Sequence, residues 1–198
     1  MTVDVVVKVG GGVLDDLDAF RAVVAAVSEA GRRARVLVVP GGGPFADAVR
    51  ELDARLPLSD DVAHWAAVLG MEQYALLLAS AIDGARLVAT PDEVSDALAA
   101  RALPVLAPYQ WLREADPLPH SWDVTSDSIA AWVAGQLGAP HVVLVKPAGA
   151  VGSAPDVVDP YFDQALAQVT EVTILAAEDA AWLPDVLGDA SGRPVNPA

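Results

Sequence analysis

Two lysines, Lys8 and Lys146, are the first residues of this chain whose type and position suggest chemistry. They are its only lysines, against ten arginines. Each stands where an apolar run ends and a glycine-containing loop begins, in VDVVVKVGGGVL and in PHVVLVKPAGAVG. A compact ammonium beside the unhindered N–H groups of a glycine loop suits the oxygens of a phosphate. The pattern therefore indicates a protein that handles phosphoryl groups.

Two glycine triplets strengthen this interpretation, because each follows an apolar run at an equivalent place. They are Gly10, Gly11 and Gly12, and Gly41, Gly42 and Gly43. Glycine lets backbone N–H groups approach an anion closely. Each triplet is also consistent with a tight strand-to-helix turn, in which glycine is the default residue. Neither matches the dinucleotide-binding fingerprint or the Walker loop.

The segment LPHSWDVTSDSIAAWVAGQLG is the second candidate region. Thr125 or Ser126 can cap a helix whose first turn contains Asp127, where the helix dipole favours a carboxylate. Two roles remain open for Asp127: helix capping, or holding a lysine ammonium or a substrate group at the ligand crevice. The preceding loop carries three further candidates, which could bind a substrate amine and ring or could form a solvated rim. These are His120, Trp122 and Asp123.

Other kinds of site find less support. His64 lies in an apolar helical stretch, where a lone histidine is more often a core or interface residue than a ligand. The three histidines are far apart in sequence and show no metal-ligand spacing, so no protein-held metal site is expected. The chain has no cysteine, which excludes disulfides and thiolate chemistry.

Composition is consistent with one globular domain spanning residues 1–198, of which 54% are hydrophobic. No run of about 18 apolar residues lacks a charge, and no secretion signal is evident, so we expect a cytoplasmic protein. The formal charge of −15 disfavours nucleic acid and anionic membranes as partners. A nucleotide would need a locally positive site, which the two lysines and Mg²⁺ would supply.

Apolar runs alternate with amphipathic stretches, which predicts right-handed βαβ crossovers. The expected fold is α/β, a three-layer αβα sandwich with a mostly parallel central sheet. Ligands bind beyond the carboxyl ends of the strands in such folds. The predicted strands are Val3–Val9, Ala34–Val39, Arg86–Ala89, Leu103–Ala107, His141–Lys146 and Glu171–Ala176. The predicted helices are Leu17–Ala30, Phe45–Leu56, Val62–Ile82, Asp92–Arg101, Thr125–Leu137, Tyr161–Val169 and Asp179–Leu187.

Four of these segments, taken in order, resemble the amino acid kinase family over nearly the whole chain. KVGGG at Lys8–Gly12 is similar to its first phosphate loop, and VVPGGGPFAD at Val38–Asp47 to its substrate-side glycine loop. TSDSIAAWVA at Thr125–Ala134 is similar to its Asp-led helix start. VVLVKPAGAVG at Val142–Gly152 is similar to its nucleotide-binding strand and loop.

The resemblance implies a kinase that uses ATP and Mg²⁺ on a small phosphate substrate, and at least a homodimer. It implies that Lys8 and Asp127 are catalytic, Lys8 stabilising the transferring phosphoryl group and Asp127 orienting Lys8 or the acceptor. The implied nucleotide-binding residues are Gly10, Gly11, Gly12, Lys146 and Gly149. The implied acceptor-binding residues are Gly41, Gly42, Gly43, His120, Trp122, Asp123 and Ser126.

Within the family, LPHSWDVTSDSIAAWVA, HWAAVLGMEQYA and VDPYF are most similar to the small kinases of methanofuran biosynthesis. Those enzymes phosphorylate [5-(aminomethyl)furan-3-yl]methyl phosphate to the diphosphate. Asp123 and Asp127 would then meet the aminomethyl cation, and Trp122 would pack on the furan ring. The alternatives are a kinase for another acceptor such as UMP, and a non-catalytic binder of nucleotide or oxyanion that serves storage or regulation.

Two departures from the family pattern affect the expected chemistry. Pro147 and Ala148 stand before Gly149, where relatives carry an acidic residue. A later Gly-Gly-Met-x-x-Lys stretch, which gives many relatives a second catalytic lysine, is absent. We therefore expect Mg²⁺ or an arginine to supply one of the essential charges.

Overall fold

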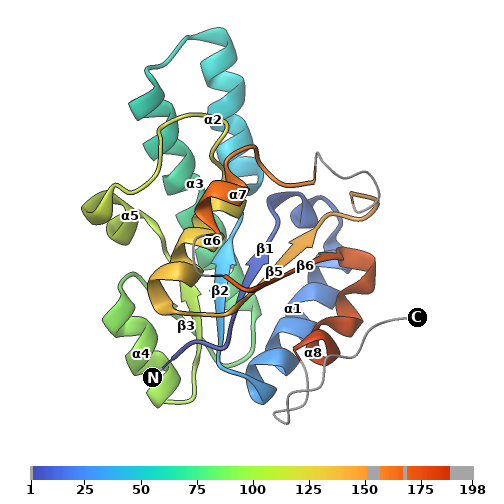
Figure 1. Cartoon of the computed structure of the whole chain (residues 1–198). Coiled ribbons are helices and arrows are strands. Elements are labelled where there is room, and N and C mark those ends of the chain that lie inside the picture. The colour runs from blue at the N-terminus through green and yellow to red at the C-terminus, as the bar shows by residue number, and fades with distance from the viewer. Residues whose placement is uncertain (1, 151–156, 167–168, 188–198) are drawn as a thin grey trace.

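A six-stranded parallel sheet forms the centre of the fold, with the strand order β3-β4-β2-β1-β5-β6 (Figure 1). The computed structural model describes residues 2–150, 157–166 and 169–187. The strands are β1 (Val5–Val9), β2 (Val36–Pro40), β3 (Ala85–Val88), β4 (Leu103–Leu106), β5 (His141–Lys146) and β6 (Glu171–Ala176). All neighbouring strands pair in parallel, so their carboxyl ends meet at one edge of the sheet.

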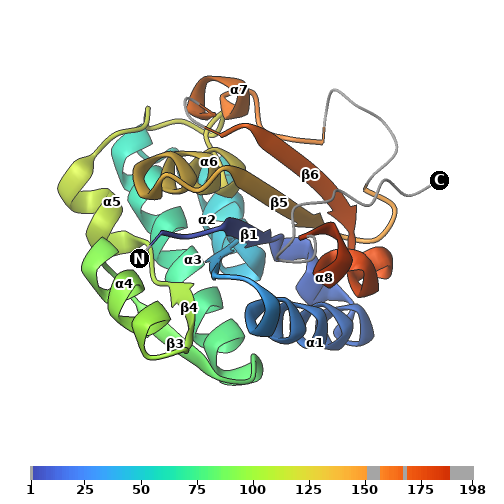
Figure 2. The same cartoon turned by 60° about the horizontal axis from the view of Figure 1, so that its bottom comes forward.

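Helices cover both faces of this sheet, which confirms the expected three-layer α/β fold (Figure 2). The α-helices are α1 (Leu17–Arg33), α2 (Gly43–Arg55), α3 (Asp60–Ala81), α4 (Pro91–Ala99), α5 (Tyr109–Ala115), α6 (Ser126–Leu137), α7 (Phe162–Ala165) and α8 (Leu183–Val186). The 3₁₀ helices are η1 (Gly11–Asp15) and η2 (Ala177–Trp182). One core cluster lies under α4, α5, α6 and α7, and the other under α1, η2 and α8.

The alternation of side chains along β1 and β5 decides which residues face α6. On β1, Val5, Val7 and Val9 belong to the core cluster under α1, while Val6 belongs to the cluster under α6. Because successive side chains of a strand point to opposite faces, Lys8 lies on the α6 side with Val6. By the same rule Lys146 lies on that side with Val142 and Leu144 of β5. The two lysines therefore share one face of two adjacent strands.

Helices α2 and α3 extend beyond the carboxyl ends of the strands and build a wall there (Figure 1). The part of α3 up to Met71 contributes Trp65, Val68 and Met71 to the cluster under α6, and the part that follows contributes Tyr74 and Leu78 to the other. Among the described helices, α3 alone is long and apolar enough to cross a membrane. Its packing against β2, β3, β4 and α2 identifies it as a helix of the folded core.

Several local predictions differ from the structure, including the single helix expected over Asp179–Leu187, which is divided into η2 and α8. Helix α1 does not end at Gly31 but continues to Arg33, because Gly31 is the point where α1 packs on β4. A Cβ atom there would lie 2.3 Å from Cδ1 of Leu103. The short helices η1 and α5 were not predicted. The expected helix Tyr161–Val169 shortens to α7, with residues 167–168 outside the described part.

Candidate functional site

A cavity of about 270 Å³ opens at the carboxyl ends of β1, β2 and β5. Its floor contains both lysines and the glycine loops, and one wall is the first turn of α6. The opposite wall is formed by α2 and α3 together with the loop that precedes α6. The polar side chains that line it are Lys8, Asp47, Arg50, Asp60, His64, Ser121, Trp122, Thr125, Ser126, Asp127 and Lys146.

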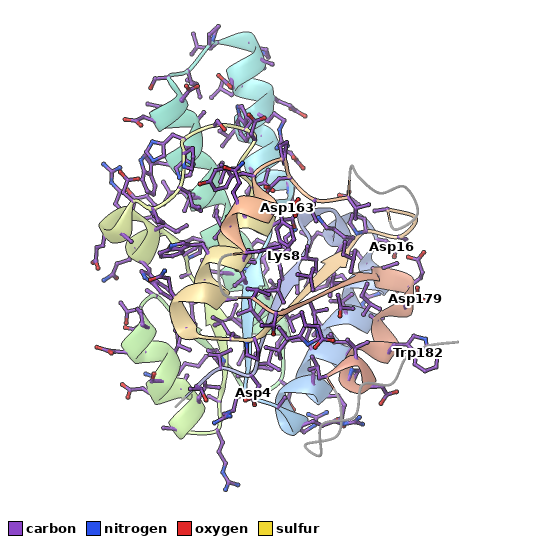
Figure 3. The ribbon with its side chains drawn as sticks, in the orientation of Figure 1. Asp4, Lys8, Asp16, Asp163, Asp179 and Trp182 are labelled. Atoms are coloured by element: carbon purple, nitrogen blue, oxygen red, sulfur yellow. The ribbon has the colours of Figure 1, made fainter. Side chains whose placement is uncertain are left out.

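The two lysines meet at one carboxylate, that of Asp127. Nζ of Lys146 donates a hydrogen bond to Oδ2 of Asp127 at 2.5 Å. Nζ of Lys8 lies 2.9 Å from Oδ1, an ion pair without the alignment of a directed hydrogen bond. All three side chains are buried, with 4% of Lys8, 3% of Asp127 and 8% of Lys146 exposed. Figure 3 shows Lys8 in the interior, away from Asp16 and Asp179 at the periphery.

Charge and burial shape the protonation of this cluster. Burial alone would raise the pKa of the Asp127 carboxyl, but Lys8 and Lys146 outweigh it and hold that pKa below its ordinary value of 3.8. Burial lowers the pKa of the Lys146 ammonium, and repulsion from Lys8 adds to the effect, against the opposing pull of Asp127 and Asp159. With both lysines protonated, the cluster carries one net positive charge in a chain of formal charge −15.

The first turn of α6 is capped from elsewhere in the chain. Thr125 occupies the N-cap position, as predicted for Thr125 or Ser126, but its side chain makes no capping hydrogen bond. Asp159, which is 8% exposed, accepts instead. Its Oδ2 accepts from the N–H of Thr125 at 2.9 Å and from the N–H of Ser128 at 3.0 Å. The hydroxyl of Thr125 also donates to Oδ2, and the hydroxyl of Ser128 donates to Oδ1. Because Asp159 accepts hydrogen bonds from N–H groups at the start of α6, the Asp127 carboxylate is not needed there and can pair with the two lysines.

The glycine loops pack against one another through their backbones. A Cβ atom on Gly11 would lie 2.2 Å from the nitrogen of Gly43, and one on Gly41 would lie 2.4 Å from the nitrogen of Gly11. A Cβ on Gly10 would lie 2.7 Å from the oxygen of Val145 in β5. Gly43 also has a φ of +58°, in the left-handed region that favours glycine. The triplets thus allow the loops after β1 and β2 to converge with β5 on one point.

Most residues selected from the sequence lie around this cavity. Lys8, Gly10, Gly11, Gly12, Gly42, Gly43, Trp122, Ser126, Asp127 and Lys146 line it. Four others do not. Gly41 packs under Gly11, and Asp123 is exposed, with its carbonyl accepting from the N–H of Tyr161 at 3.3 Å. The N–H of Gly149 donates to Glu178 at 3.2 Å, and His120 lies behind the cavity wall.

His64 was expected to be a core or interface residue, but it lines the cavity. Its ring stacks on that of His120, with the centroids 4.2 Å apart. Burial and the nearby charge of His120 lower the pKa of His64 to about 4, so His64 is neutral at pH 7. His120 in turn lies between two carboxylates: its Nε2 is 2.8 Å from Asp116, and its Nδ1 contacts Asp61.

Trp122 is fixed on the same wall. Its indole N–H donates to Asp53 of α2 at 2.8 Å, and the guanidinium carbon of Arg50 lies 4.6 Å from the ring centroid. Arg50 also donates to Asp47 at 2.8 Å. Sequence reasoning did not select Asp47, Arg50 or Asp60. The sequence did carry a signal for them: Asp47 and Arg50 are spaced one helical turn apart on α2, and Asp60 lies in the first turn of α3.

Comparison with known proteins agrees with this architecture. The model of the amino acid kinase family matches residues 5–176. The chain is 25% identical over 139 residues to the [5-(aminomethyl)furan-3-yl]methyl phosphate kinase of Methanocaldococcus jannaschii. That match covers 70% of this chain and 63% of that protein, so the chain spans less than two thirds of this curated relative's length.

Two solved structures are similar in fold. The UMP kinase of Ureaplasma parvum superposes with a TM-score of 0.60 at 16% identity, covering 91% of this chain and 92% of that one. The uridylate kinase of Archaeoglobus fulgidus superposes with a TM-score of 0.56 at 19% identity, covering 74% of this chain and 63% of that one.

Proposed function

Because the chain belongs to the amino acid kinase family, we propose that it is an ATP-dependent kinase acting on a small phosphate monoester and forming a diphosphate. One observation carries the proposal. Two buried lysines share the carboxylate of Asp127 at the floor of a cavity that is bordered by glycine backbone. Such a site suits two phosphate groups that must approach each other against their repulsion.

The transfer itself needs little covalent help from the protein. An oxygen of the acceptor's phosphate dianion attacks the γ-phosphorus of ATP, and a new P–O bond forms. The bond from that phosphorus to the β,γ-bridging oxygen breaks, and its electron pair leaves with ADP. The attacking oxygen carries no proton, so no general base is required. The residues contribute alignment and positive charge, which together account for most of the rate enhancement in such reactions.

The residues present fit a Mg²⁺ ion that would arrive with ATP and would be held mainly by phosphate oxygens and water. Among residues 2–150, 157–166 and 169–187, no group of three His, Cys, Asp or Glu side chains could hold a metal ion. Asp127, which lines the cavity, is already engaged by both lysines. Bound Mg²⁺ would neutralise charge on the nucleotide phosphates.

For the acceptor we propose [5-(aminomethyl)furan-3-yl]methyl phosphate, the compound named for the relative from Methanocaldococcus jannaschii. Its phosphate would lie at the lysines. Its ammonium would meet Asp60 and the neutral ring of His64 on the opposite wall, and its furan ring would lie against Trp122. This assignment replaces the expected contacts from Asp123, which is exposed, and from Asp127, which is occupied by the lysines.

The test is ADP formation from ATP and Mg²⁺ with a panel of acceptors, in the wild type and in Lys8→Ala. The panel holds the aminomethylfuran phosphate, its hydroxymethyl analogue and UMP. We expect the aminomethyl compound to give the highest kcat/KM, and Lys8→Ala to lose at least about 100-fold in kcat. Turnover of UMP alone would reassign the acceptor. Tight nucleotide binding without turnover of any acceptor would indicate the non-catalytic alternative.

We also expect a homo-oligomer. Val62, Leu69 and Leu76 recur every seven residues on the outer side of α3 and are 53%, 42% and 58% exposed. That spacing suits packing of α3 against the same helix of a second copy across a two-fold axis. Light scattering of the wild type and of Leu76→Lys tests it: a dimer that becomes monomeric is expected, and a monomeric wild type would contradict it.

A further inference from the structure

The position of Lys146 differs from what its place in the sequence suggested. It stands at the end of β5, just before the loop expected to bind the nucleotide. Its ammonium does not point along that loop but bonds to Asp127 within the lysine cluster. Its backbone neighbour Pro147 and the glycines of the first loop border the same part of the cavity.

We infer that Lys146 is a second catalytic cation, which contacts the transferring phosphoryl group from the side opposite Lys8. The inference rests on the proposed function and deepens it. Asp127 is then a positioning residue: each of its carboxylate oxygens faces one ammonium, so the two cations stand on either side of a fixed point.

No other cation among the described residues is placed to do this. Arg50 is the one arginine of residues 2–150, 157–166 and 169–187 that lines the cavity, and it is held at the α2 wall by Asp47 and by the ring of Trp122. The chain has no third lysine. The expectation that an arginine would replace the missing second lysine is therefore not supported by this part of the structure, whereas Lys146 already stands beside Lys8.

The geometry also explains why one carboxylate suffices for two lysines. One lysine paired with one carboxylate has no net charge with which to attract the phosphates. Two ammonium groups that share one carboxylate have a net charge of plus one. During transfer, negative charge spreads over the three equatorial oxygens of the γ-phosphoryl group. A cation on each side can contact different oxygens of that group, which a single lysine cannot do. Burial makes each contact stronger than it would be in water.

The test separates a transition-state contact from a nucleotide-binding contact. In Lys146→Met we expect kcat to fall about 100- to 1,000-fold while the KM for ATP changes by less than about threefold. Lys146→Arg should recover part of kcat. Arg86→Met, which removes an exposed cation on β3, is the matched control and should behave as the wild type.

Binding provides a readout that does not depend on turnover. Calorimetry should show that Lys146→Met binds ADP as the wild type does but loses most of the added affinity for ADP with aluminium fluoride and acceptor. Retained ADP binding also shows that the variant is folded. A raised KM for ATP with unchanged kcat, or an equal loss of affinity for both ligands, would contradict the inference. Lys146 would then be a nucleotide-binding residue. An inactive wild type would instead overturn the proposed function, and the fluoride complex would still test Lys146.

Discussion

Asp159 and Asp127 both lie at the first turn of α6, but only Asp159 bonds to the helix backbone. It accepts from the N–H groups of Thr125 and Ser128, while Asp127 faces Lys8 and Lys146. One carboxylate therefore completes the helix and the other serves the cavity. This division predicts that substitution of Asp159 and substitution of Asp127 have different consequences.

Asp159→Ala should destabilise the fold by about 1–3 kcal/mol, because buried donors at the start of α6 lose their acceptor. Urea denaturation measures the free energy of unfolding. Asp163→Ala is the control, since Asp163 is an exposed carboxylate nearby in the sequence. Equal unfolding midpoints for both variants would contradict the capping role.

Asp127→Asn should cost both activity and stability at pH 7, because two buried ammoniums lose their shared countercharge. Removing one partner of a buried ion pair costs about 3–5 kcal/mol. The pKa of Asp127 is lowered in the folded protein, so its stabilisation is present above its ordinary value of 3.8 and is lost as the pH falls through the folded pKa. The difference in unfolding free energy between wild type and variant should thus shrink in acid. A difference that does not vary with pH would contradict the pairing.

The alkaline limb of the kcat profile should report Lys146. Its pKa is lowered from 10.5 by burial and by Lys8, against the opposing charges of Asp127 and Asp159. Catalysis by the ammonium should therefore fall as the pH rises through a value below 10.5. Lys146→Arg should move this limb upward, because a guanidinium does not lose its proton in that range. An unmoved limb would exclude Lys146 as the titrating group.

His120 should hold the loop before α6 in a pH-dependent way. Burial alone would lower its pKa, but hydrogen bonds to Asp61 and Asp116 outweigh this and raise it above 6.5. Its stabilisation is therefore full below pH 6.5 and is lost as the pH rises through the folded pKa. We expect His120→Asn to destabilise the protein by up to about 1 kcal/mol at pH 6 and by less at pH 9. Thermal unfolding at both pH values measures this, and a larger loss at pH 9 would contradict it.

Gly11→Ala should disrupt the site, because the new Cβ would lie 2.2 Å from the nitrogen of Gly43. We expect loss of nucleotide binding and a destabilisation of several kcal/mol. Gly135→Ala in α6 is the matched control, since nothing lies within 4 Å of its added Cβ. That change should stabilise the helix by about 0.5–1 kcal/mol. Equal behaviour of the two variants, measured by calorimetry and urea denaturation, would contradict the packing argument.

The local pattern of apolar runs made much of the fold predictable from sequence. The bounds of β5 and β6 were predicted as observed, and Lys8, Asp127 and most of the selected glycines do meet at one edge of the sheet. These predictions succeeded because apolar runs define parallel strands and because the carboxyl ends of such strands coincide in space.

The remaining features depend on tertiary contacts. Asp159 caps α6 from a distant part of the chain, which no local capping pattern reveals. The apolar character of the α3 sequence indicated that His64 lies on a helix, but it did not show that this part of the helix stands beyond the sheet and faces a cavity. Gly31 looks like a helix-ending residue in the sequence, but the structure shows that a glycine is needed there because of its close packing on Leu103.

The backbone contacts between the loops after β1 and β2 have a further consequence. Because Gly11, Gly41 and Gly43 pack directly against one another, these backbone contacts themselves hold the proposed anion-binding site in place. Little binding free energy is then lost in ordering it. The same close packing makes these positions interdependent, so a substitution at one glycine would require simultaneous substitutions at its neighbours. New acceptors are more readily accommodated by altering the wall formed by α2 and α3 than by altering the floor.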